Sequence, residues 1–187
     1  MEEAKNTKLI NESSNEMKQN FLSNAISDIT TYIQFTDTKV SIIMGSVVAL
    51  VVGFLACYDL ISKVLKDIMP CSWLGICICI FTLINFFSLI AVFAFGILTI
   101  RGHKSDIGYK SKWFLSQSVN EYSFDIFKED LKIMTDEDII ENMAAELFKL
   151  NDINRQKAKT MNRTIHAFSL LISTTVIIMI LLLINTL

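Results

Sequence analysis

The stretch that decides the fold is TDTKVSIIMGSVVALVVGFLAC, residues 36–57. From Val40 to Cys57 it runs for 18 residues without a charge, the short end of the length needed for a helix that spans a bilayer. Small side chains recur at every fourth position and so form one stripe along a helix: Ser41, Gly45, Ala49, Gly53 and Cys57. Packing rather than hydrophobicity drives helix association in lipid, so we expect Ser41, Gly45, Ala49 and Gly53 to be a helix-packing surface. The alternative is a chance run of small residues.

Two further runs have the same character. Residues 72–100 contain 29 positions without a charge, and residues 167–187 contain 21. A soluble domain of 187 residues with 52% hydrophobic content would not segregate its apolar residues in this way. The pattern therefore predicts an all-α fold, a three-span transmembrane helical bundle.

The polar parts of the chain predict a cytoplasmic helical extension. Apolar residues fall at helical spacing in the segment before the first span: Met17, Phe21, Leu22, Ala25, Ile26, Ile29, Tyr32 and Ile33. Thr135 and Asp138 resemble a capping box, and a second apolar stripe follows it: Ile139, Ile140, Met143, Ala144, Leu147, Leu150 and Ile153. We expect these two faces to pack together, and the second helix to run without interruption into the third span. At Thr36 and Asp37 either a new helix begins or the first helix continues.

This pattern divides the chain into seven segments. They are a flexible tail (1–13), a cytoplasmic amphipathic helix (14–37), transmembrane helix 1 (38–58), an outer loop (59–71), transmembrane helix 2 (72–100), a cytoplasmic helical segment (101–164) and transmembrane helix 3 (165–187). Residues 101–164 carry 11 of the 17 basic residues, and none follows the third span. The positive-inside rule therefore places the N-terminus and residues 101–164 in the cytoplasm and the C-terminus outside, in a multi-pass membrane protein.

The chemistry-bearing motifs of enzymes are missing. The sequence has no glycine-rich phosphate loop, no GxSxG elbow and no HExxH, so we expect no enzyme activity, no catalytic residues and no cofactor. No Cys or His cluster has the spacing of a metal site. Whether Cys57 and Cys71 pair as a disulfide stays open, as does the number of subunits.

Five polar positions are candidates for a more specific role. Asn85 lies near the middle of the second apolar run, and we expect it to make an interhelical hydrogen bond or to face a pore. Arg155, Lys159 and Arg163, together with Lys157, could contact a phosphate. From charge alone we favour the simpler explanation. In it these basic residues keep their segment on the cytoplasmic side of the membrane and attract anionic lipid headgroups.

One segment resembles a known family. YIQFTDTKVSIIMGS, residues 32–46, is similar to the signature YI-x-FADTK-A-SILLG of the Pycsar transmembrane effectors, with Thr36 and Val40 in place of smaller residues. SKWFLSQSVNEYSFDIF (111–127) is similar to the aromatic stretch after that family's second span, and ELFKLNDINRQKAKTMNRTIHAF (146–168) to its charged helix before the last span. In this motif Tyr32, Asp37 and Lys39 stand at the hinge between the cytoplasmic helix and the first span.

The resemblance implies a bacterial anti-phage effector that impairs the inner membrane and causes abortive infection. A partner nucleotide cyclase would supply the signal, with a cyclic pyrimidine mononucleotide as the suspected ligand, and the chain would act as a homo-oligomer in the lipid bilayer without binding nucleic acid. Two alternatives remain: a non-toxic membrane anchor or regulator that binds a soluble partner through its cytoplasmic helices, and a holin-like protein that needs no nucleotide.

Overall fold

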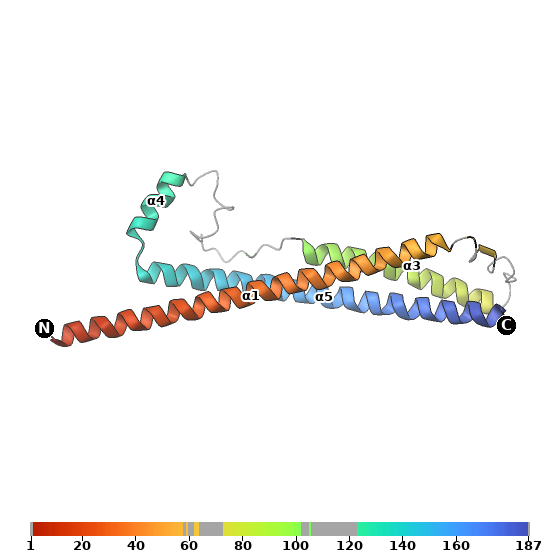
Figure 1. The fold of residues 1–187 in the computed structure, drawn as a ribbon, viewed down its shortest axis with the longest axis horizontal. Coiled ribbons are helices and arrows are strands. Elements are labelled where there is room, and N and C mark those ends of the chain that lie inside the picture. The colour runs from red at the N-terminus through yellow and green to blue at the C-terminus, as the bar shows by residue number, and fades with distance from the viewer. Residues whose placement is uncertain are drawn as a thin grey trace. The chain divides into compact units, whose positions relative to one another are not determined.

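The computed structural model describes residues 2–57, 59, 62–63, 73–101, 105 and 123–186, with side chains up to residue 184 and, in the first helix, from Ser13 onward. The described residues form four labelled helices and no strand: α1 (Glu2–Ala56), α3 (Trp73–Ile100), α4 (Phe124–Ile133) and α5 (Asp136–Thr186). Figure 1 shows their order along the chain. The all-α fold predicted from the sequence is confirmed.

The chain divides into two compact units, and both long helices contribute to each. Unit 1 takes in Met1–Gln34 and His103–Arg155, and unit 2 takes in Phe35–Gly102 and Gln156–Leu187.

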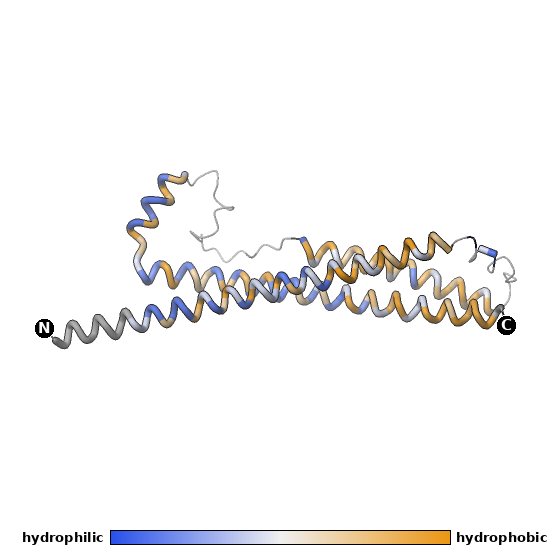
Figure 2. The backbone as a smooth tube through the Cα atoms, in the orientation of Figure 1, coloured by the Kyte–Doolittle hydropathy of each residue, from blue (hydrophilic) through white to orange (hydrophobic). Residues whose placement is uncertain are grey.

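Unit 2 contains the three apolar helical segments. α1, α3 and α5 are each long and apolar enough to cross a membrane. Figure 2 shows that the hydrophobic residues concentrate on the parts of these helices that belong to unit 2. Val47, Val92 and Leu171, one from each helix, form its buried core, and half-buried apolar residues surround them: Ile43, Leu89, Phe93, Ala167 and Phe168.

Unit 1 contains the polar first half of α1, α4 and the first turns of α5. The predicted capping box starts α5, because the Thr135 backbone N–H donates to Asp138 Oδ2 at 2.9 Å and the Asp138 N–H donates to Thr135 Oγ1 at 3.3 Å. Ser123 caps α4 in a similar way, accepting from the Ile126 N–H at 3.4 Å. These caps satisfy N–H groups that have no partner within their own helix.

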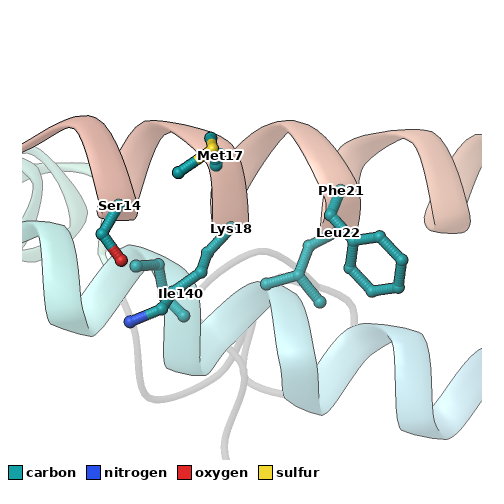
Figure 3. Close-up of a pocket in the computed structure, with 6 residues that line it drawn as sticks. All are labelled: Ser14, Met17, Lys18, Phe21, Leu22 and Ile140. Atoms are coloured by element: carbon teal, nitrogen blue, oxygen red, sulfur yellow. The ribbon is translucent and has the colours of Figure 1, made fainter.

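The predicted contact between the two polar helices is present in unit 1. Ile140 of α5 shares a pocket of about 370 Å³ with one face of α1, made by Ser14, Met17, Lys18, Phe21 and Leu22 (Figure 3). The contact is narrower than the sequence pattern implies, because Met17, Phe21 and Tyr32 remain more than 60% exposed. Leu22, Ala25, Ile26, Ile29 and Ile33 are the members of the predicted face that are half-buried.

The course of α1 bears on two boundaries. Residues 1–13, expected as a flexible tail, are helical from Glu2 onward. Of the two alternatives left open at Thr36 and Asp37, the structure has the second, because α1 continues through both residues without a new start. A helix that already has a long packed segment extends at little cost per residue, because nucleation is the expensive step. α5 is the uninterrupted helix that the absence of glycine and proline predicted, with 51 residues.

Candidate functional site

An ion pair joins α1 and α5 inside unit 2. Lys157 Nζ donates to both carboxylate oxygens of Asp37, at 2.5 and 2.7 Å. The Lys157 side chain is only 7% exposed, whereas that of Asp37 is 35% exposed. A charged donor that meets both oxygens makes a strong hydrogen bond, and removing either partner would leave a charge without compensation. This pair is a specific polar contact between the two long helices in unit 2.

The sequence pointed to Asp37 but not to its partner. Asp37 stood out as part of the family motif, while Lys157 looked like one of several basic residues that topology requires. The structure separates Lys157 from that group, because its side chain is buried against α1. No spacing rule relates positions 120 residues apart, so only the packing of α1 on α5 identifies the pair.

The other motif residues have different surroundings. The Lys39 ammonium lies 4.1 Å from the centre of the Phe35 ring, one turn back on α1. A cation over an aromatic face is weakly stabilised at an exposed site. Tyr32 is 64% exposed and belongs to unit 1. Asp37 is bonded to another helix through Lys157, and the hinge role of all three residues stays a prediction.

The small-residue stripe lies outside the packing face of its own chain. Ser41, Gly45, Ala49 and Gly53 are all exposed, and a Cβ atom added at Gly45 or Gly53 would meet no heavy atom within 4 Å. The buried face of α1 in unit 2 is instead formed by Thr36, Val40 and Val47. Ala49 and Gly53 line an open groove of about 820 Å³ together with Phe168, Ile172 and Met179 of α5. If the stripe packs a helix, that helix is none of those in the described part of the chain.

Close approach within the chain occurs at a glycine that sequence reasoning missed. A Cβ atom at Gly96 of α3 would lie 2.7 Å from Met44 Sδ, 3.1 Å from Met44 Cγ and 3.5 Å from Val40 Cγ1. A single glycine in a long apolar run carries no periodic signal, which explains why the pattern did not reveal it. Gly96 leaves room on α3 for the Met44 side chain of α1.

Asn85 makes interhelical hydrogen bonds, one of its two expected roles. Its amide nitrogen lies 3.1 Å from the Leu171 carbonyl oxygen, 2.9 Å from Thr174 Oγ1 and 2.8 Å from Thr175 Oγ1. Both threonine hydroxyls also donate to carbonyls of their own helix, so they accept from Asn85. This cluster ties α3 to α5 among apolar neighbours.

The three basic residues proposed for a phosphate all point outward from α5. Arg155 is bonded to Asp152 at 2.7 Å and its side chain is 83% exposed. Lys159 and Arg163 are exposed in unit 2, and the Arg163 guanidinium lies 5.8 Å from the Phe95 ring centre. Spacings of four residues place the three on one side of α5, where an anion could reach them.

Among the described residues, no group of three or more His, Cys, Asp or Glu side chains could hold a metal ion. Cys57, Cys77 and Cys79 are free thiols. Cys71, named as a disulfide partner for Cys57, lies outside the described residues.

The chain matches a known protein family. Residues 21–185 of the 187-residue chain match the Pycsar effector protein domain. Neither the curated proteins nor the solved structures gave a match. The matched range includes Asp37, Lys157 and Asn85, so the contacts described above fall inside the shared domain.

Proposed function

The chain belongs to the Pycsar effector family, and from this premise we propose that it is an anti-phage membrane effector that impairs the bacterial inner membrane when a cyclic nucleotide signals infection. Membership of the family supports two of these points, the location in a membrane and the role in defence against phage. The nucleotide signal, the damage to the membrane and the resulting abortive infection are the proposed parts. The proposal assigns no catalysis to the chain itself.

The observation that supports a signalling role is the continuity of α1 and α5. Each is one unbroken helix with a polar segment in unit 1 and an apolar segment in unit 2. We expect the polar segments in the cytoplasm, following the distribution of Lys and Arg. A helix transmits rotation or translation along its axis, so a ligand that favours one arrangement of the polar segments would shift the apolar ones.

The proposed ligand contacts are Arg155, Lys159 and Arg163. A phosphate carries the charge that these exposed guanidinium and ammonium groups bind, and a cyclic mononucleotide has one phosphate. Lys157 is not among the proposed ligand contacts, because its ammonium group is bonded to the carboxylate of Asp37. Ligand binding beside Lys157 would bear directly on the ion pair that joins α1 to α5.

The exposed stripe supports the assembly step. Ser41, Gly45, Ala49 and Gly53 lie outside the packing face of their own chain, and small residues in lipid allow close helix approach. We propose that a second copy packs there in the active state, which makes the effector a homo-oligomer.

Membrane depolarisation in cells tests the proposed function. The chain would be expressed with an active cyclase or with a catalytically inactive cyclase, and a potential-sensitive dye would report the membrane. We expect depolarisation only with the active enzyme. Depolarisation with both would identify a holin-like protein, and depolarisation with neither would favour the anchor or regulator.

The ligand contacts need a separate comparison. Arg155→Ala, Lys159→Ala and Arg163→Ala should each raise the amount of cyclase needed for depolarisation. Lys132→Ala is the matched control, since Lys132 is an exposed basic residue paired with Glu129 on α4. Equal responses from all four variants would show that the phosphate does not bind at these positions.

A further inference from the structure

Unit 2 contains a cavity of about 170 Å³ that is lined by all three of its helices. Val47 and Leu171 of the packed core are buried at one end, whereas Phe54 and Leu55 on its rim are exposed. The cavity is therefore closed toward the core and opens at the surface of the apolar bundle. A molecule dissolved in the lipid could enter it from there.

Asn85 lines this cavity and has one hydrogen-bonding atom to spare. Its amide nitrogen meets three acceptors on α5, the Leu171 carbonyl oxygen and the hydroxyls of Thr174 and Thr175, which both donate to a carbonyl of their own helix. An amide nitrogen has only two hydrogens to give, so both are engaged. Because all three neighbours accept, the amide oxygen must point away from them. No described residue donates to Asn85 Oδ1.

The walls of the cavity suit an organic molecule better than water. Seven of its nine lining residues are apolar, and the two polar ones are Asn85 and Thr175. A buried water needs about three hydrogen bonds, and most of this volume offers it none. By contrast, a cavity of about 150 Å³ with apolar walls stays dry in another protein and binds benzene. The cavity of unit 2 has room for one molecule of that size.

We propose that this cavity binds one compact, mostly apolar molecule that carries a single hydroxyl or N–H donor, such as a phenol. The ring packs on the side chains of Leu50, Val51 and Phe54, and the donor bonds to Asn85 Oδ1. A polar atom among apolar neighbours is costly without a partner, so this hydrogen bond gives the site its preference. A lipid acyl chain has no donor and would leave the oxygen unpaired.

Occupation of the cavity bears on the assembly of the effector. Leu50, Phe54 and Thr175 line both the cavity and the open groove beside the small-residue stripe. A molecule held by all three helices stabilises their arrangement in the single chain. It would therefore oppose any rearrangement of these helices on activation, and more cyclase would be needed for depolarisation. This consequence rests on the proposed function, but the binding itself does not.

Thermal unfolding of the full chain in lipid nanodiscs, followed by circular dichroism, tests the binding. Phenol is compared with toluene, which has nearly the same size and shape but no donor. Phenol should raise the unfolding midpoint, and the rise should grow with its concentration. Toluene should raise the midpoint less at the same concentration, although it partitions more strongly into lipid. The comparison therefore separates the hydrogen bond to Asn85 from the filling of space.

Three variants locate the effect. Val51→Phe fills the cavity with a side chain of the protein and should abolish the shift with phenol. Val52→Phe is the matched control, because Val52 is the exposed neighbour that does not line the cavity, and it should keep the shift. Asn85→Leu removes the acceptor and should make phenol no better than toluene.

Equal shifts in Val51→Phe and Val52→Phe would overturn the proposal, and so would an unmodified chain that shows no preference for phenol over toluene. Neither measurement uses a cyclase or a membrane potential. The binding site can therefore fail while the proposed function stands, and the reverse.

Discussion

Two polar contacts give unit 2 its specificity, since apolar side chains in lipid discriminate weakly between partners. The Asp37–Lys157 pair joins α1 to α5, and the Asn85 cluster joins α3 to α5. They differ in what is lost when one partner is removed. Replacing Lys157 by an apolar residue leaves the Asp37 carboxylate without its cation. Replacing Asn85 leaves the hydroxyls of Thr174 and Thr175, which still donate to a carbonyl of their own helix.

Lys157→Met should lower the stability of the chain by about 1–3 kcal/mol, below the value for a fully buried pair because Asp37 is partly exposed. The double variant Asp37→Lys with Lys157→Asp should recover most of the loss. Thermal unfolding of the detergent-solubilised chain, followed by circular dichroism, measures both.

Arg155→Met is the control for this prediction. It removes a cation from the exposed pair with Asp152, which should change stability by less than about 0.5 kcal/mol. A loss as large as that of Lys157→Met would mean that the measurement reports general charge and not the specific pair.

Asn85→Leu should cost about 0.5–2 kcal/mol, because interhelical hydrogen bonds in membrane proteins are individually modest. Ser88→Ala is its control, since the Ser88 hydroxyl donates to the Ile84 carbonyl of its own helix. Unfolding in a mixed-detergent titration compares the two, and a larger loss for Ser88→Ala would contradict the assigned role of Asn85.

The helices of unit 2 use their glycines in opposite ways. Gly96 on α3 allows contact with Met44 and Val40, while Gly53 on α1 opens to a groove. The same substitution should therefore have different effects at the two positions.

Gly96→Val should destabilise the chain by about 1–3 kcal/mol, because its branched side chain would overlap Met44 and press on Val40. Gly53→Val should leave the stability of a single chain nearly unchanged. Met44→Ala should partly restore the Gly96→Val variant by making room. Equal losses at Gly96 and Gly53, measured by thermal unfolding, would show that close approach at Gly96 is not required.

How far the sequence predicts the structure depends on the kind of signal. The length of the uncharged runs predicts the three apolar helices, and the Thr135–Asp138 motif predicts the start of α5. Both signals depend only on residues that are neighbours in the sequence. The sequence does not predict which side of α1 packs on α3 and α5, because a stripe of small residues can pack on a helix of the same chain or on a helix of another molecule. In unit 1 the apolar stripe of α5 was the natural choice for burial, yet Glu146 and Lys149 are buried, because the packing of a whole unit decides a helix's rotation.

For the molecule as a whole, the open side of α1 connects the fold of one chain to its action in the membrane. The helices of unit 2 pack through Val47, Val92 and Leu171, which leaves the stripe Ser41–Gly53 outside the packed face. A surface that is not needed for folding can be altered without unfolding the protein. Loss of activity after such a change then points to contact with another molecule.

Gly45→Leu should therefore abolish toxicity while membrane insertion and single-chain stability remain normal. A Cβ atom at position 45 has no heavy atom within 4 Å among its neighbours in the structure, so leucine fits in a single chain. The leucine side chain would, however, hold a second helix away from the stripe. Val48→Leu is the control, because Val48 is an exposed residue of α1 beside the stripe whose side chain is already large, so the change adds little bulk. Colony survival with an active cyclase, together with the membrane-fraction level of each variant, measures the effect. If Gly45→Leu stays as toxic as Val48→Leu at equal levels, the stripe is not the surface through which copies assemble.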